Sequence, residues 1–138
     1  MQDRYLFKAK RKDDGEWVFG GLSYCEKTNA YFITNMGKDH ISYIGFHQEV
    51  DSNTICQCTG LKDKNGKLIF ENDIVTYLDV YSTDSGLAEA NCVGKVVWDD
   101  ETISFQVTNR LSAESYEVLG DECSVIGNVF DNPELLEE

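Results

Sequence analysis

The chain has 138 residues, of which 41% are hydrophobic and 12% aromatic, and its formal net charge is −13. This composition is typical of one globular domain, or of two small lobes sharing a core, and excludes a disordered protein. The apolar runs are far shorter than the roughly 20 residues of a membrane helix, and no apolar segment follows the basic N-terminus, so we expect neither membrane association nor secretion.

The charge is unevenly distributed. Residues 1–50 carry seven acidic and seven basic side chains, whereas residues 51–138 carry eighteen acidic and five basic ones. Because an acidic field repels phosphates, we expect no direct nucleic-acid binding by the second part. The neutral part contains one small basic cluster beside a tryptophan, and these five residues form the candidate interaction surface: Lys8, Lys10, Arg11, Lys12 and Trp17.

Turn signals recur about every ten residues and helical periodicity is scarce, which favours an all-β fold. In the first part, the pattern predicts a three-stranded meander from residues 5–10, 16–24 and 31–34, followed by a strand at 41–50. Gly20 and Gly21 indicate a bulge or a close backbone approach. The polar run at 51–54 is the expected boundary between an N-terminal lobe, 1–54, and a C-terminal lobe, 55–138.

The second lobe should contain about five short strands, which suits a small β-barrel. Asn65-Gly66 predicts a turn with positive φ at the glycine. The segment 79–91 is polar and is expected to be a loop. The remaining predicted elements are strands at 74–78, 94–98, 104–107, 116–119 and 124–129, and a helical turn at 133–136 that Asn132 caps.

Five cysteines are present, namely Cys25, Cys56, Cys58, Cys92 and Cys123. An odd number without a secretory signal predicts reduced thiols in a cytoplasm. Cys56 and Cys58 would lie on one face of a strand, and no second pair at short spacing completes a zinc site. We therefore assign no metal ligand and no cofactor.

Three acidic residues, Asp63, Glu71 and Asp73, cluster around two turns. They could act as acid and base or bind a divalent cation, but Asp and Asn in turns commonly accept hydrogen bonds from backbone amides, and we favour this structural interpretation. The aromatic residues of the meander could likewise form a stacking platform or a core, and strand alternation favours a core: Trp17, Phe19, Tyr24, Tyr31 and Phe32.

Two long segments, Gln57–Val75 and Val125–Leu136, resemble the signature of the YopX family of phage and prophage proteins, and 6–22 is similar to the start of one subgroup. Asn72 replaces the family's usual glycine, and Asn tolerates the left-handed conformation required there. The resemblance implies an SH3-like β-barrel for the second lobe and a bacterial host. It implies no catalytic residue. The turn residues of its motif are Asp63, Asn65, Gly66, Glu71 and Asp73.

The leading hypothesis is a mainly β, non-enzymatic interaction or assembly module in which the meander packs on the SH3-like barrel. We expect homo-oligomers that form through residues 1–50, where charge repulsion is smallest. Its protein partners are unknown. One alternative is a nucleic-acid-linked accessory protein, either a weak single-strand binder or an acidic decoy of a DNA-binding protein. Another is a small hydrolase that uses Asp, Glu and His, with His40 and His47 as the available histidines.

Overall fold

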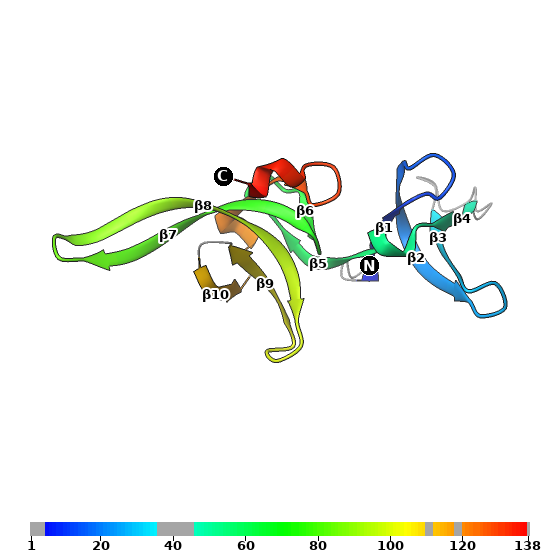
Figure 1. Ribbon diagram of the computed structural model, residues 1–138, viewed down its shortest axis with the longest axis horizontal. Helices are drawn as coiled ribbons and strands as arrows, with labels where there is room; N and C mark the ends of the chain where they lie inside the picture. Colours follow the sequence, from blue (N-terminus) through cyan, green and yellow to red (C-terminus); the bar gives the residue numbers. More distant parts are fainter. Residues whose placement is uncertain (1–4, 36–45, 110–111, 118–119, 138) are drawn as a thin grey trace. The chain divides into compact units, whose positions relative to one another are not determined.

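The computed structural model describes residues 5–35, 46–109, 112–117 and 120–137. These residues form antiparallel sheets linked by turns and short 3-10 helices, which confirms the mainly β prediction (Figure 1). The chain divides into two compact units, Met1–Gly60 and Leu61–Glu138. The predicted break at 51–54 contains a 3-10 helix, η2 (Ser52–Thr54), whose first turn is capped by the side chain of Asp51.

Unit 1 contains the predicted meander, and the order of its strands is β4-β3-β2-β1-β5. The strands are β1 (Phe7–Lys10), β2 (Trp17–Cys25), β3 (Ala30–Asn35), β4 (Phe46–Val50) and β5 (Cys56–Lys62), of which β5 crosses the division between the units. Residues 41–45 of the predicted fourth strand lie outside the described residues. A Cβ atom at Gly20 would collide with the carbonyl oxygen of Thr34, so the predicted close backbone approach is confirmed.

The core of unit 1 is aliphatic. It consists of Ala9, Val18, Ile33 and Val50, each at most 7% exposed. The end of β1 returns to β4 through a bridge between Arg11 and Val50 and a 3.0 Å hydrogen bond from the Lys12 amide to the Glu49 carbonyl. The two ends of the meander are thereby joined around the core.

Unit 2 contains a five-stranded antiparallel sheet in the order β10-β9-β8-β7-β11. Its strands are β7 (Asp73–Thr83), β8 (Gly86–Asp99), β9 (Ser104–Asn109), β10 (Ser112–Glu117) and β11 (Cys123–Asn128), and the short β6 (Leu68–Phe70) forms a hairpin with β5. The core contains Ile69, Val75, Val96, Val107 and Cys123. Among the described residues no pairing joins β10 to β11, so the sheet is open and the SH3-like barrel stays a prediction.

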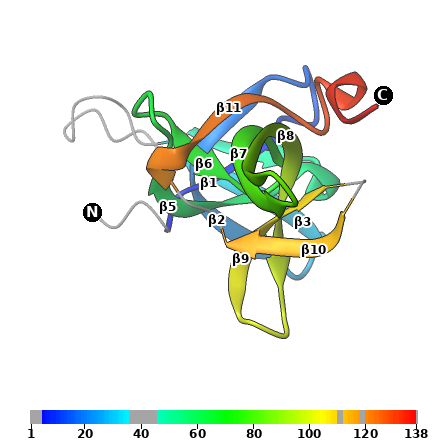
Figure 2. The same ribbon diagram turned by 90° about the vertical axis from the view of Figure 1, so that its left-hand side faces the viewer.

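The loop predicted at 79–91 is wrong. β7 and β8 pair continuously from Ile74–Lys95 to Thr83–Gly86 and form a long ribbon, seen from the side in Figure 1 and from its end in Figure 2. The tight turn is held by the hydroxyl of Thr83, which donates to the Gly86 carbonyl (2.8 Å) and accepts from the Ser85 amide (3.3 Å). The strand pattern could not be recognised in residues 78–91, because they are mostly small or polar and neither face of the ribbon is buried there.

The predicted C-terminal helical turn is confirmed as a 3-10 helix, η4 (Pro133–Leu136). Its expected side-chain cap is absent, since the Asn132 side chain instead accepts a hydrogen bond from the Asn128 amide (3.3 Å). A further 3-10 helix, η3 (Gly120–Glu122), precedes β11. None of the helices in the described part of the chain has the length and apolar character needed to cross a membrane.

Candidate functional site

Two lysines and a tryptophan meet on the outward face of β1 and β2. Because side chains alternate along a strand, Lys8 and Lys10 lie on the face opposite Ala9, where Lys8 is only 8% exposed and Lys10 is half-buried. Lys10 pairs with Trp17 in the sheet register. The Nζ atoms of Lys8 and Lys10 lie 4.8 Å and 5.4 Å from the centroid of the Trp17 ring, within cation–π range. Phe19, which is 46% exposed, pairs with Lys8 on the same face. We call these four residues the Lys–Trp face.

The other two basic residues of the predicted surface form ion pairs with acidic side chains. The Arg11 guanidinium donates to both carboxylate oxygens of Asp14 and lies 3.8 Å from Asp13. The hydrogen bond to Asp14 raises the pKa of Arg11. The pKa of Asp14 is lowered, first by the hydrogen bond from the Glu16 amide and then by the hydrogen bond from Arg11. Lys12 forms a 3.1 Å ion pair with Glu49. The predicted cluster is therefore not one continuous basic patch.

The aromatic core predicted for the meander is wrong for Phe19 and Tyr24 and confirmed for Tyr31, which packs against the aliphatic core. Phe19 and Tyr24 are 46% and 49% exposed, and the buried positions belong to smaller aliphatic residues. Val18 occupies the inward position of β2, which places its neighbours Trp17 and Phe19 on the outward face. Sequence alternation showed that Trp17 and Phe19 share a face but did not show which face is buried.

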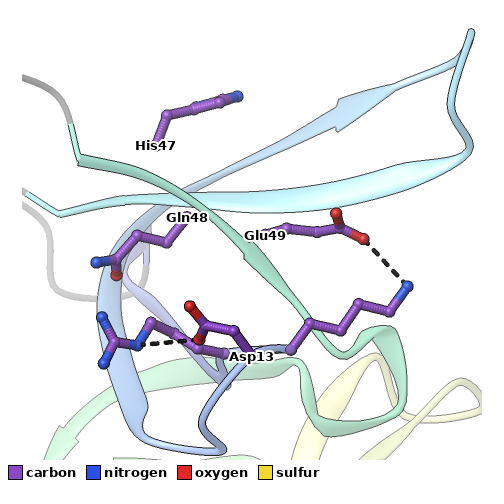
Figure 3. A pocket seen from close by; sticks show the side chains of 6 residues that line it. Asp13, His47, Gln48 and Glu49 are labelled. Atoms are coloured by element: carbon purple, nitrogen blue, oxygen red, sulfur yellow. Dashed lines mark hydrogen bonds and ion pairs between the residues drawn. The ribbon is translucent and has the colours of Figure 1, made fainter.

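A pocket of about 300 Å³ lies beside this region, and its walls come from the end of β1, the following turn and β4: Arg11, Lys12, Asp13, His47, Gln48 and Glu49 (Figure 3). It contains the residue types of the hydrolase hypothesis. However, Asp13 and Glu49 face Arg11 and Lys12, and the His47 ring stacks on Phe32 with centroids 4.2 Å apart. Figure 3 shows His47 apart from both acids. His40, the other histidine, lies outside the described residues.

Sequence reasoning did not single out Gln48. Its Oε1 atom is buried, and within the described part of the chain it has no hydrogen-bond partner. This oxygen could accept a hydrogen bond from an N–H or O–H group that enters the pocket. A glutamine in a strand carries no sequence signal for such a role.

Asp63 occupies the centre of the first family-motif turn. One carboxylate oxygen accepts hydrogen bonds from the amides of Asn65 and Lys67, both at 2.9 Å, and the other accepts from the Val125 amide at 2.9 Å. Burial raises the pKa of Asp63, but these three hydrogen bonds together outweigh burial and lower it. Gly66 has φ of +82°, which confirms the predicted turn conformation. The Asn65 side chain donates to the hydroxyl of Ser124 (3.2 Å).

The second motif turn is organised in the same way. The Asp73 side chain is buried and accepts a 2.8 Å hydrogen bond from the Phe70 amide. Asn72 has φ of +70°, which confirms that it adopts the left-handed conformation, and its amide donates to the Val96 carbonyl (2.8 Å). Glu71 is half-buried beside it. Asp63 and Asp73 thus stabilise backbone turns, as the structural interpretation expects.

The structure shows no grouping of His, Cys, Asp and Glu that could hold a metal ion, within the residues it describes. All five cysteines are free thiols. Cys56 and Cys58 are both fully buried and lie at alternate positions of β5, so they share a face as predicted. The carboxylates at the end of β8 accept hydrogen bonds from nearby residues: Asp100 from the Trp98 indole (2.8 Å) and Asp99 from the Glu101 amide (2.9 Å).

Known proteins similar to this chain were found at the level of both sequence family and solved structure. The family model described as "YopX protein" matches residues 6–137. The crystal structure of protein EF1440 from Enterococcus faecalis is 27% identical, with a TM-score of 0.52, and the match covers 95% of this chain and 96% of that one. No curated protein matches the chain. Because the family match extends over nearly the whole sequence, the chain belongs to the YopX family.

Proposed function

We propose that this protein is a phage-derived, non-enzymatic interaction module of the bacterial cytoplasm. The observation that supports the proposal is the Lys–Trp face, where Phe19 is exposed beside a tryptophan flanked by two lysines. Aromatic residues are enriched in the parts of interfaces that dominate binding energy. The five free cysteines suit a reducing compartment.

The turns of the family motif support the same proposal by a different route. The carboxylate oxygens of Asp63 and Asp73 accept hydrogen bonds from backbone amides. The acids of the pocket face Arg11 and Lys12. Carboxylates held in this way are poorly placed for acid–base chemistry, because a general base needs its oxygen directed at a substrate proton. We therefore favour binding over hydrolysis, with unit 2 as a rigid, barrel-like scaffold.

The test is site-specific photo-cross-linking in bacterial cells that express the prophage. A photoreactive amino acid replaces Phe19 in one variant and Thr28 in a control, because Thr28 is exposed in the turn between β2 and β3 of the same unit. We expect a discrete protein adduct at position 19 and none at position 28, insensitive to nuclease. Equal adducts at both positions, or none at position 19, would contradict a binding role for the Lys–Trp face.

One further candidate is a weak single-strand nucleic-acid binder. Exposed aromatic rings beside lysines are the arrangement on which bases stack. The acids that hold Arg11 and Lys12 reduce the positive field that phosphates require. This candidate therefore ranks second, and fluorescence anisotropy with oligonucleotides separates it from the first.

A further inference from the structure

The ribbon formed by β7 and β8 extends beyond the rest of its sheet. β11 pairs with β7 only over residues 73–77, and β9 pairs with β8 only over residues 95–99. Residues 78–83 and 86–91 pair with each other, and within the described ranges no strand covers their outer edges (Figure 1). We call residues 78–91 the arm. A two-stranded ribbon is marginally stable by itself in water, so we expect pairing with a further strand to stabilise the arm.

The arm lacks three of the features that usually protect an edge strand, although it carries the charged residues Asp79 and Glu89. Edges are normally blocked by charged side chains, above all lysine, by proline or by a β-bulge. The two outer strands of the sheet follow this rule, because the β10–β9 register shifts between Ser112 and Ser115 and the β11–β7 register shifts between Val125 and Gly127. The arm has no register shift over its pairs, and its sequence, LDVYSTDSGLAEAN, has neither lysine nor proline.

One face of the arm carries three exposed apolar side chains beside Ser82, Glu89 and Asn91. Leu78 and Val80 are 50% and 52% exposed and lie two residues apart, so they share a face. Leu87, which is 77% exposed, pairs with Ser82, the next position on that face. Contiguous exposed apolar side chains on a soluble protein mark an interaction site.

We infer that the arm binds a second copy of this chain by antiparallel pairing of residues 78–82 with the same residues of the other copy. An antiparallel strand edge is self-complementary about a two-fold axis, the symmetry of most oligomers. A register centred on Val80 sets position 80 opposite 80, 78 opposite 82 and 79 opposite 81. Position 79 then lies opposite position 81, which is not acidic. Leu78, Val80 and Leu87 of both copies lie on one face, which also carries Ser82, Glu89 and Asn91.

The edge of β7 suits this pairing better than the edge of β8. Residues 78–83 are rich in β-branched and aromatic types, whereas residues 86–91 consist of glycine, alanine, leucine and polar residues with low strand propensity. From the sequence we expected self-association through residues 1–50, because the second half of the chain is acidic. The arm itself carries only Asp79, Asp84 and Glu89, and the field of more distant acids is screened beyond about 8 Å at physiological salt.

Two consequences follow for the strength of the association. Five paired residues from each copy bury a small area, so the dimer should be weak and dependent on concentration, as interfaces at the low end of the size range are. Added salt should strengthen it, since salt screens the like charges and leaves the apolar contact intact. This inference rests on the proposed role in protein contacts, but it concerns a surface in the other unit from the Lys–Trp face.

The test is sedimentation of the full chain over a range of concentrations, with a pair of variants that change charge equally. Val80→Lys places a lysine on the arm edge, and Ile126→Lys places one on β11, where Ile126 is 42% exposed on a strand with a register shift. We expect a rise in mass above 15.6 kDa for the natural chain, weakening of the dimer by about tenfold for Val80→Lys, and no change for Ile126→Lys. Circular dichroism confirms that both variants fold.

A second measurement reports the register. Val80→Cys should form an intermolecular disulfide on mild oxidation, because directly opposite residues of paired strands lie within reach of one another, and Ile126→Cys should not. A natural chain that stays monomeric at every concentration, or two lysine variants that dimerise equally, overturns the inference. If the dimer persists in Val80→Lys but is lost in Phe19→Lys, the arm is excluded while the proposed binding role of the Lys–Trp face stands.

Discussion

The carboxylate of Asp63 accepts a 2.9 Å hydrogen bond from the amide of Val125, which lies 62 positions later in the chain. The same turn adds a 3.0 Å hydrogen bond from the Lys64 amide to the Cys123 carbonyl. These bonds attach the β5–β6 hairpin to the start of β11. They join the two segments in which the YopX resemblance is strongest, so the family signature describes how unit 2 is held together.

Replacing Asp63 by Asn should lower the free energy of unfolding at neutral pH by about 2 kcal/mol. The carboxylate accepts three amide hydrogen bonds, whereas an amide side chain presents one oxygen and one N–H, so one buried donor loses its acceptor. Urea unfolding measures the difference. Asp84→Asn, which makes the same charge change in the exposed turn of the arm, should have almost no effect.

The effect of Asp63→Asn should also depend on pH. The pKa of Asp63 is lowered in the folded protein, so this group stabilises the fold above the pKa of the unfolded state, about 3.9, and the stabilisation is lost as pH falls through the lower folded-state pKa. The stability gap between the natural chain and the variant should narrow in acid. A gap that stays constant down to strongly acidic pH would show that Asp63 acts without its charge.

Gly66→Ala should destabilise the protein by about 1 kcal/mol, because an L-residue is strained in the left-handed region. A Cβ at position 66 would meet no atom within 4 Å, so backbone conformation alone accounts for the cost. Gly21→Ala is the matched control, since its Cβ also meets nothing and its φ is not in the left-handed region. Equal melting temperatures for the two variants would contradict the conformational explanation.

Local patterns predicted the parts of the fold that short-range chemistry determines. Asn65-Gly66 and Asn72 specify left-handed turns, and both were predicted because few residues tolerate that conformation. The alternation around Trp17 and Phe19 predicted the strand but not which of its faces is buried. The buried face is the one that packs against Ile33 and Val50, which come from two other strands. The arm was missed because a strand without a buried face has no apolar alternation to detect.

The candidate surface was predicted only in part for a similar reason. Lys8, Lys10 and Trp17 are close in sequence and meet through one hairpin register. Glu49, which neutralises Lys12, is 37 residues away and is brought there by the return of β1 to β4. Long-range pairing of this kind cannot be read from local spacing.

Cys25 should be the first cysteine to react with iodoacetamide in the native protein. Hydrogen bonds from the side chain and amide of Thr28 lower the pKa of Cys25, whereas burial, followed by the charge of Asp63, raises the pKa of Cys123. The thiolate of Cys25 should therefore form at lower pH than that of an ordinary cysteine. Mass spectrometry of timed samples measures the order of labelling. In Thr28→Ala the reaction of Cys25 should shift to higher pH, and faster labelling of buried Cys56 or Cys123 would contradict the assignment.

Tight binding of nucleic acid is not expected at physiological salt. On the Lys–Trp face Lys8 is buried and Lys10 is half-buried. Arg11 and Lys12 are paired with acids, and the second half of the chain carries the whole net charge of −13. Fluorescence anisotropy with single- and double-stranded oligonucleotides should give only weak, sequence-independent signals. The opposite outcome is sub-micromolar single-strand binding that weakens with added salt, is lost in Trp17→Ala and persists in the control Trp98→Ala of unit 2. It would make nucleic acid the ligand of this face, because base stacking and phosphate neutralisation both have to contribute to reach that affinity.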